Sequence, residues 1–171
     1  MPIYALGDRV PHIHEDAYVH PDAVVIGDVH IGADSSIWPT AVLRGDYGTI
    51  IIGERTSIQD GTVVHAVDEY PTVIGSDCVI GHLAHLEGCT IHDRALVGSG
   101  SIVLHQAVVH TGATVGAGAV VRNKMEVPAN SSALGVPAQI RPGTSEESVA
   151  VASAALYAEN GRRFREELRQ L

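Results

Sequence analysis

Imidazole and carboxylate side chains recur in the middle of this sequence at positions where they could hold a metal ion. The imidazoles belong to His65, His82 and His85, and the carboxylate belongs to Glu87. Two histidines and one carboxylate that leave a coordination position open are a common catalytic set for a divalent metal. We therefore expect metal chemistry here, provided that the fold gathers these side chains at one place.

The aliphatic residues indicate how the fold could gather these side chains, because they repeat with a period of six. The period holds without a break for Val97, Val103, Val109, Val115, Val121 and Val127. An amphipathic helix needs apolar positions three and four apart, and a strand needs alternation, so neither explains this spacing. A short strand plus a turn for each hexapeptide does explain it, and three such units close one coil of a prism. The sequence therefore predicts an all-β fold, a parallel β-helix of hexapeptide repeats, rather than an ordinary β-sandwich.

The ladder of aliphatic residues extends upstream, with two widened steps. Its members there are Ile26, Ile31, Ile37, Leu43, Ile52, Ile58, Val64, Ile74, Ile80, Leu86 and Ile91. The chain takes nine residues from Leu43 to Ile52 and ten from Val64 to Ile74. Insertions in repeat folds form loops on one face, and that face is often the functional one. We expect both insertions to lie near residues with chemical uses.

Counting one prism side for each step assigns the inward residues of successive coils to the same side. One side receives Leu43, Val64 and Leu86, and another receives Ile58 and Ile80. The residue after each inward aliphatic points outward, which puts Arg44, His65 and Glu87 in one column with neighbours roughly 4.8 Å apart. The adjoining side presents Gln59, Asp60 and His82, and His85 lies at the corner between the two sides. One carboxylate and up to three imidazoles thus gather at one prism edge.

The remaining histidines have a plainer explanation. We expect surface or capping roles for His12, His14, His20, His30, His92, His105 and His110. Of these, His92 and His110 share a different side of the prism and could form a pair, but no further ligand accompanies them. The tripeptide Arg44-Gly45-Asp46 is interpreted as part of an ion pair between subunits.

Composition excludes some classes of function. The chain has 11 lysine and arginine residues against 20 aspartate and glutamate residues, which gives a net charge of −9. We find no basic stripe, so nucleic acid is not an expected partner. Cys78 and Cys89 lack a CxxC spacing and are interpreted as buried thiols in a reducing compartment. The sequence shows neither a signal peptide nor a membrane-spanning apolar run, so we expect a soluble cytoplasmic protein without membrane contact.

The repeat stops near Pro128, which suggests the division of the chain. Residues 1–143 are expected to form the β-helix domain, in which residues 1–20 cap the first coil and the coils proper begin near Pro21. Residues 144–171 are expected to form a C-terminal α-helix that packs on its own prism or on a neighbouring subunit. Its start is predicted from the capping-box spacing of Thr144 and Glu147. Its apolar stripe is expected to comprise Leu156, Phe164, Leu168 and Leu171, with Gly161 as a weak point.

Several short runs occur here in an order that is specific for one family. They are SIWPTAVLRGD at 36–46, TSIQDG at 56–61, VH at 64–65, IGH at 80–82, GCTI at 88–91 and GVPA at 135–138. With these runs the chain closely resembles the γ-class carbonic anhydrase-like proteins over nearly its whole length. Members of that family are trimeric left-handed β-helices that hold zinc or iron between two subunits. The resemblance therefore implies a left-handed parallel β-helix and a homotrimer.

The resemblance also implies how the metal is held. His65 would bind the ion from one chain, and His82 would bind it from the neighbouring chain. This division is consistent with their positions on adjoining sides of the prism. Arg44 and Asp46 would form the ion pair that crosses between subunits.

Further roles and one departure follow from the same resemblance. Gln59 would orient the metal-bound water, Asp60 would support the site, and Tyr157 matches a tyrosine that the family carries near the site. Where the family has its third histidine, this chain has Glu87, and a histidine stands nearby at His85. The candidate third ligand is therefore Glu87 or His85. The expected cofactor is Zn²⁺, with Fe²⁺ or Co²⁺ as alternatives.

Three functions compete. The leading hypothesis is a metal-dependent carbonate dehydratase, a lyase that hydrates carbon dioxide to bicarbonate. The second is a hexapeptide acyltransferase that uses coenzyme A, although acyl transfer does not need the Arg44–Asp46 pair or Gln59. The third is a non-catalytic metal-binding or assembly trimer, which the change to Glu87 favours.

Overall fold

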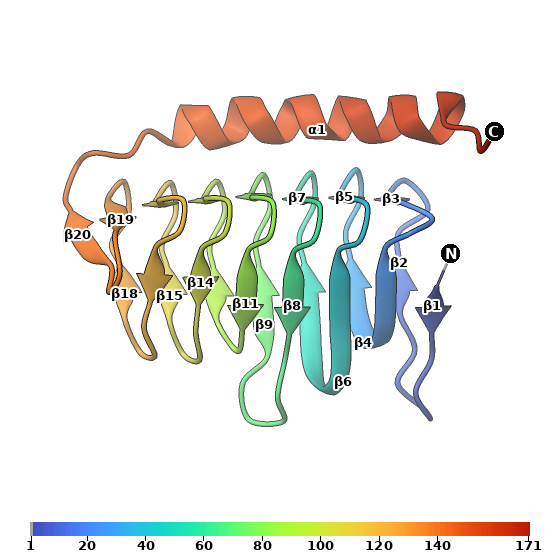
Figure 1. Ribbon diagram of the computed structural model, residues 1–171, viewed down its shortest axis with the longest axis horizontal. Helices are drawn as coiled ribbons and strands as arrows, with labels where there is room; N and C mark the ends of the chain where they lie inside the picture. The colour runs from blue at the N-terminus through green and yellow to red at the C-terminus, as the bar shows by residue number, and fades with distance from the viewer. Residues whose placement is uncertain (1) are drawn as a thin grey trace.

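The computed structural model describes residues 2–171 and shows a parallel β-helix with one long α-helix lying along it (Figure 1). Short strands follow one another around three sides of a prism, and most pair in parallel with strands of neighbouring coils. We call these sides the first, second and third faces, in the order in which the chain visits them. The predicted fold class, a hexapeptide-repeat β-helix with a C-terminal α-helix, is confirmed.

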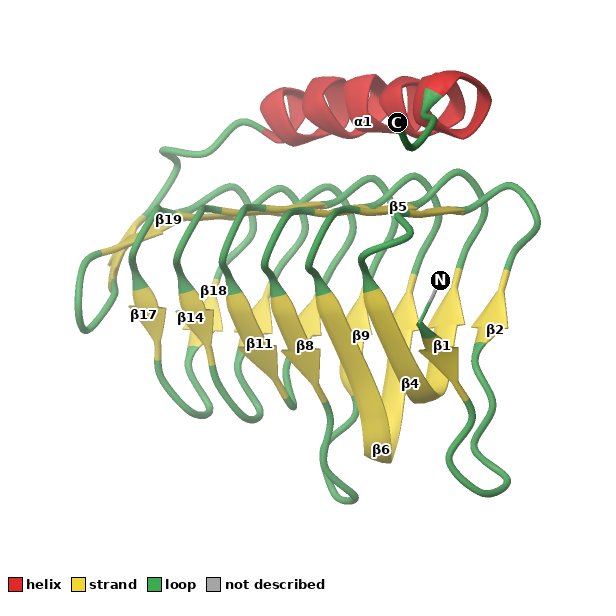
Figure 2. Ribbon diagram, turned by 45° about the vertical axis from the view of Figure 1, so that its right-hand side comes forward, coloured by secondary structure: helices red, strands yellow, loops and turns green. Residues whose placement is uncertain are grey.

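The first and second faces belong to one continuous sheet (Figure 2). Two long strands, β4 (Val24–Ile31) and β6 (Val42–Ile52), contribute to both faces. The first face otherwise consists of β1 (Ile3–Tyr4), β8 (Val63–His65), β11 (His85–Glu87), β14 (Ile102–Val103) and β17 (Val120–Val121). The second face otherwise consists of β2 (His12–Ile13), β9 (Thr72–Ile74), β12 (Thr90–Ile91), β15 (Val108–Val109) and β18 (Glu126–Val127).

The third face is a separate sheet. Its parallel strands are β3 (Tyr18–Val19), β5 (Ser36–Ile37), β7 (Ser57–Ile58), β10 (Val79–Ile80), β13 (Leu96–Val97), β16 (Thr114–Val115) and β19 (Ser132–Leu134). A last strand, β20 (Gln139–Arg141), pairs antiparallel with β19 and ends the parallel stack. The helix lies over this third face, as both ribbon views show (Figures 1 and 2).

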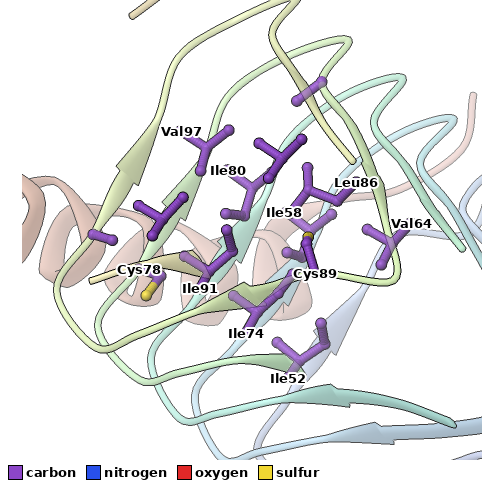
Figure 3. Close-up of a cluster of buried hydrophobic side chains, with 14 of the residues drawn as sticks. Ile52, Ile58, Val64, Ile74, Cys78, Ile80, Leu86, Cys89, Ile91 and Val97 are labelled. Atoms are coloured by element: carbon purple, nitrogen blue, oxygen red, sulfur yellow. The ribbon is translucent and has the colours of Figure 1, made fainter. Parts of the chain in front are cut away.

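Aliphatic side chains fill the interior of the prism. Every valine of the unbroken ladder from Val97 to Val127 is completely buried, and Figure 3 shows residues of successive coils stacked inside. The N-terminal part of the predicted ladder needs one correction, because Val25 is completely buried and Ile26 is not. Val25 pairs in register with Leu43, so it is Val25 that continues the inward column.

The corners of the prism require unusual backbone. Among residues 2–171, nine residues other than glycine have φ between +51° and +62°, the left-handed region that L-residues rarely adopt. Glycines after inward aliphatic residues serve a different need, which is close approach between coils. A Cβ atom added to Gly53 would lie 2.6 Å from the carbonyl carbon of Gly75, so no larger residue fits there without a backbone shift.

The N-terminal residues form a turn of the β-helix rather than only a cap on it. β1 and β2 both pair with β4, and β3 pairs with β5. The prediction that coils begin near Pro21 is therefore wrong, because strand pairing already begins at Ile3. The first residue, which the predicted cap included, lies outside the described residues.

The C-terminal helix α1 (Glu147–Glu167) begins later than the capping-box spacing predicts. Glu146 is its N-cap and makes no side-chain capping hydrogen bond. The Thr144 hydroxyl instead donates to the carbonyl of Arg141 at 2.7 Å. The predicted capping box is therefore wrong, because Thr144 belongs to the turn before the helix.

The predicted apolar stripe of the helix is correct for Phe164, whose ring centroid lies 5.0 Å from that of Trp38, but wrong for its leucines. Leu156 is 56% exposed and Leu168 is 46% exposed. The buried helical residues are Ala150, Ala154, Ala158 and Gly161. Gly161 is not a weak point but a contact point, because a Cβ atom there would lie 3.2 Å from Tyr18 Cβ. Small residues face the sheet because they let the helix backbone approach it closely.

The two widened steps behave as insertions. Residues 46–49 are the extra residues that shift the register between β4 and β6. Residues 66–71 form the loop between β8 and β9, which projects from the prism on the side away from the helix (Figure 1). Among residues 2–171, no helix combines the length and the apolar character that crossing a membrane requires. Cys78 and Cys89 are buried, as predicted, and burial raises the pKa of each thiol to about 12.

Candidate metal centre

The predicted column of Arg44, His65 and Glu87 exists on the first face. Strand pairing places Arg44 of β6 in register with His65 of β8, and His65 in register with Glu87 of β11. The three side chains therefore come from three successive coils. The sequence achieves this because Leu43, the inward residue before Arg44, pairs in the same way with Val64, the one before His65.

His65 lies between two carboxylates. Its Nδ1 is 2.8 Å from Glu87 Oε1, and its Nε2 is 3.0 Å from Asp46 Oδ1. The imidazole is only 12% exposed, and the Thr72 hydroxyl donates to the His65 carbonyl. A neutral imidazole donates from one nitrogen only, so both contacts together are hydrogen bonds only when the ring is protonated. A metal ion at either nitrogen would replace the proton there.

Three imidazoles lie around the Glu87 carboxylate. Besides His65, its carboxylate lies 3.4 Å from His85 Nε2 and 3.8 Å from His105 Nε2. Burial by itself would raise the pKa of Glu87, but hydrogen bonds from His65 and His85 and the nearby His105 outweigh it. The pKa of Glu87 is therefore lowered, and the group stays a carboxylate.

His105 is a neighbour of Glu87, although its sequence pattern predicts a surface or capping role. It comes directly after Leu104, and Leu104 follows Val103, which pairs with Leu86. The column count therefore puts His105 one residue beyond the level of Glu87. This count along the sequence is the signal that could have predicted a place for His105 near Glu87.

Arg44 and Asp46 meet within one chain, where the Arg44 guanidinium donates to an Asp46 carboxylate oxygen. Desolvation opposes the ionised form of Asp46, but hydrogen bonds from Arg44 and His65 lower its pKa overall. The ion pair across subunits that the resemblance implies stays a prediction. Asp46 has a role that the prediction lacked, since it also contacts the candidate ligand His65.

Gln59, Asp60 and His82 lie at the edge between the third and first faces. Gln59 follows Ile58 of β7 and is almost completely buried. The Asp60 carboxylate lies 2.9 Å from His82 Nδ1, and the His82 side chain is 48% exposed. The structure thus joins Asp60 to His82 in one pair, separate from the hydrogen-bonded group around His65.

Tyr157 lies on α1, above the third face. Its ring contacts the Trp38 ring edge-on, with centroids 5.8 Å apart. Trp38 donates its backbone N–H to Ile58, and Gln59 donates to Ile80, so Trp38 and Gln59 occupy equivalent positions in neighbouring coils. Tyr157 is therefore placed one coil away from Gln59, on the side of the helix that faces the sheet.

The donor set suits a divalent transition metal, but one chain supplies it in two parts. His65 with Glu87 offers nitrogen and oxygen ligands on the first face, and His82 offers a second imidazole at the adjoining edge. Within residues 2–171, no three histidine, cysteine, aspartate or glutamate side chains have the geometry to enclose an ion. The residues present would fit a divalent metal ion if a second chain completed its shell.

Comparison with protein families adds an independent finding to this geometry. Residues 11–45, 71–105 and 88–123 match the family described as bacterial transferase hexapeptide (six repeats). The chain belongs to the hexapeptide-repeat family. The six-residue ladder agrees with the hexapeptide repeats that the family description names.

Curated members of the hexapeptide-repeat family confirm the predicted relationship to γ-class carbonic anhydrase-like proteins. The mitochondrial γ carbonic anhydrase 1 of Arabidopsis thaliana is 41% identical over 85% of this chain. The carnitine operon protein CaiE of Escherichia coli is 38% identical over 87% of this chain and 76% of its own length. The chain spans about half the length of the Arabidopsis relatives that it matches, namely 55% and 56%.

Solved structures of hexapeptide-repeat proteins have the same architecture. A proposed acetyltransferase from Bacillus cereus superposes with a TM-score of 0.92 at 33% identity, covering 97% of this chain and 98% of the other. A hexapeptide transferase family protein from Anaplasma phagocytophilum superposes with a TM-score of 0.89 at 36% identity, covering 95% and 96%. These neighbours share the prism and the helix over almost their whole length.

Proposed function

We propose that the protein is a trimeric γ-class carbonic anhydrase-like metalloprotein that hydrates carbon dioxide to bicarbonate. The observation that carries the proposal is the 2.8 Å contact between His65 and Glu87, with His82 presented at a different edge. We call His65 with Glu87 one half-site and His82 the other. When chains associate side by side, one half-site of each chain can meet the other half-site of its neighbour and form a whole metal site. The 41% identity to a protein named as a γ carbonic anhydrase supports the same reaction.

In the proposed trimer, His65 and Glu87 of one subunit and His82 of the next hold Zn²⁺, or alternatively Fe²⁺ or Co²⁺. A divalent ion held by such a set supplies Lewis acidity, the property that lets water act as a nucleophile near neutral pH. Glu87 suits this role because its lowered pKa keeps it negatively charged. Glu87 contacts His65 at 2.8 Å, whereas His85 contacts Glu87 at 3.4 Å, so His85 is the weaker candidate for the third ligand.

Neighbouring side chains fix the imidazoles. A carboxylate accepts hydrogen bonds, so Asp60 holds the proton of His82 on Nδ1 and leaves Nε2 free as a ligand. Whichever nitrogen of His65 binds the ion, the other nitrogen keeps a carboxylate partner, either Asp46 or Glu87. Both arrangements orient the ring before the metal arrives.

Two further residues complete the proposal. Gln59 has a buried amide that can orient a water molecule by hydrogen bonding. Tyr157 is assigned to the site through Trp38, whose ring it contacts one coil away from Gln59. A cytoplasmic location stays a prediction, since the Arabidopsis relatives are named as mitochondrial.

The test combines mass, metal and rate on the full-length protein. We expect a trimer by light scattering and one metal ion for each chain by elemental analysis of aerobically and anaerobically purified protein. We also expect carbon dioxide hydration in a stopped-flow pH assay that is lost in His82→Ala. A monomer, or a metal-loaded trimer with no hydration, contradicts the proposal, and the second outcome favours a non-catalytic assembly.

The second candidate is an acyltransferase that uses coenzyme A. The observation in its favour is the TM-score of 0.92 to a proposed acetyltransferase from Bacillus cereus. Acyl transfer requires coenzyme A binding, whereas hydration does not. Saturable binding of acetyl coenzyme A by calorimetry, unaffected by a metal chelator, would favour this candidate over the first.

A further inference from the structure

Leu83 has a backbone conformation that its side chain does not favour. Its φ is +58°, in the left-handed region where Cβ crowds the following carbonyl oxygen. Nine residues other than glycine adopt this region in residues 2–171, and Leu83 is the only one with an apolar side chain. The other eight are Asp34, Thr40, Arg55, Asp77, Arg94, Gln106, Lys124 and Asn130.

Glycine occupies the same corner in the coils on either side of Leu83. The N–H of Gly61 donates to Pro39, that of Leu83 to Asp60, and that of Gly100 to His82, so the three are equivalent. Gly61 and Gly100 have φ of +68° and +65°, which glycine adopts without steric cost. One coil before Gly61 the same corner holds Thr40, with φ of +60°, so Leu83 is the apolar residue of this column, and it stands at the level that also carries His82.

Leu83 gains little burial in return for this strain. It is 71% exposed within a single chain, although leucine is normally a core residue. Its Cδ2 lies over Gly61, where an added Cβ would come within 2.6 Å. A strained and exposed apolar residue beside a candidate ligand points to a role at the site.

We propose that Leu83 is the apolar wall of the site between subunits, packing across the boundary on a second copy of this chain and shielding the ion from solvent. This inference rests on the proposed function, because His82, the residue before Leu83, is the ligand given to the neighbour. The first face offers a matching apolar contact in Val63, which is 37% exposed. Val63 stands next to His85 in the strand pairing, close to the His65–Glu87 half-site.

The experiment compares three variants of the full-length protein. Leu83→Gly removes the wall and relieves the strain, while Leu83→Asn keeps a side chain of similar length that tolerates the left-handed region. Lys124→Gly is the matched control, because Lys124 has φ of +62° and is exposed at a different corner. Trimer dissociation is followed by sedimentation, and metal release to a chelator is followed by absorbance of the Co²⁺-loaded trimer.

We expect both Leu83 variants to raise the trimer dissociation constant and the rate of chelator-driven metal release at least tenfold, with Lys124→Gly unchanged. Wild-type values for either quantity in both Leu83 variants would overturn the proposal. A wild-type protein that holds no metal would instead refute the proposed function. In that case the dissociation constant alone decides whether Leu83 is a subunit contact.

Discussion

His65 Nδ1 and Glu87 Oε1 lie 2.8 Å apart, although the two residues are separated by 22 positions in the sequence. The pairing of Val64 with Leu86 inside the prism sets this distance, because the outward residues that follow share the same register. Parallel strands repeat at roughly 4.8 Å, which is close enough for neighbouring side chains to share a proton or an ion. The half-site is therefore held by rigid sheet rather than by a loop.

Arg44→Ala should weaken the trimer more than the single chain. The Arg44 side chain is 42% exposed, so its pair with Asp46 is screened by solvent and should contribute about 1 kcal/mol or less to unfolding. At an interface the remaining Asp46 charge would be buried without its guanidinium partner, which costs more. We expect the trimer dissociation constant to rise about tenfold, as measured by sedimentation.

Arg55→Ala is the control for that experiment. Arg55 also forms an ion pair, with Asp77 at 2.7 Å, but at a corner away from the candidate site. Equal dissociation of the two variants would show that Arg44 has no special place at the interface.

Glu87→Gln should reduce stability at neutral pH but not in acid. Because the pKa of Glu87 is lower in the folded state, its carboxylate stabilises the fold above the unfolded carboxyl pKa of about 4.3. This contribution is lost as the pH falls through the lower folded value. We expect the difference in unfolding free energy between wild type and Glu87→Gln, measured with urea, to shrink as the pH falls below about 4.

The matched variant for this comparison is Glu69→Gln, in the exposed loop between β8 and β9. It removes the same charge from an exposed loop position, away from the imidazoles around Glu87. A pH dependence that is equal for both variants would mean that the contacts of Glu87 do not stabilise the fold.

The sequence predicts the middle of this molecule well because one spacing fixes two things at once. A six-residue step determines which aliphatic residue faces inward, and the inward residues then determine which side chains share an outward column. Arg44, His65 and Glu87 follow from that count alone. The count does not determine the rotamers of the outward side chains, and so it does not predict the contact of His65 with Asp46.

The ends of the chain are harder to predict because the repeat does not govern them. A search for large apolar residues selects Leu156, whereas the helix packs through Ala154 and its small neighbours. Close approach of a helix to a sheet favours alanine and glycine, and hydropathy ranks these residues low. The strand pairing of residues 3–19 was missed for a similar reason, since their ladder is short and interrupted.

Ala154→Leu tests the packing of the helix. Ala154 is completely buried against the third face, so a larger side chain forces the helix away and should cost about 1–3 kcal/mol of unfolding free energy. Ala155→Leu is the control, because Ala155 is exposed and the change should stay within about 0.5 kcal/mol. The measurement is urea unfolding followed by circular dichroism. Similar costs for the two variants would mean that α1 does not pack as described.

The last prediction concerns which residue completes the metal shell. Glu87 contacts His65 at 2.8 Å, whereas His85 contacts Glu87 at 3.4 Å. We therefore expect Glu87→Ala to lower the metal content sharply and His85→Ala to change it little. Elemental analysis of both proteins after the same purification provides the measurement.

Glu87→His extends the same argument to the rate. A carboxylate ligand donates negative charge to an ion, which makes a coordinated water less acidic than three neutral imidazoles do. Wild-type hydration should then be low at neutral pH and rise in the alkaline range. We expect Glu87→His to keep the metal and to increase carbon dioxide hydration at pH 7 at least tenfold, shifting the rise toward lower pH. If His85→Ala instead abolishes metal binding while Glu87→Ala retains it, then His85 is the third ligand and the assignment of Glu87 is wrong.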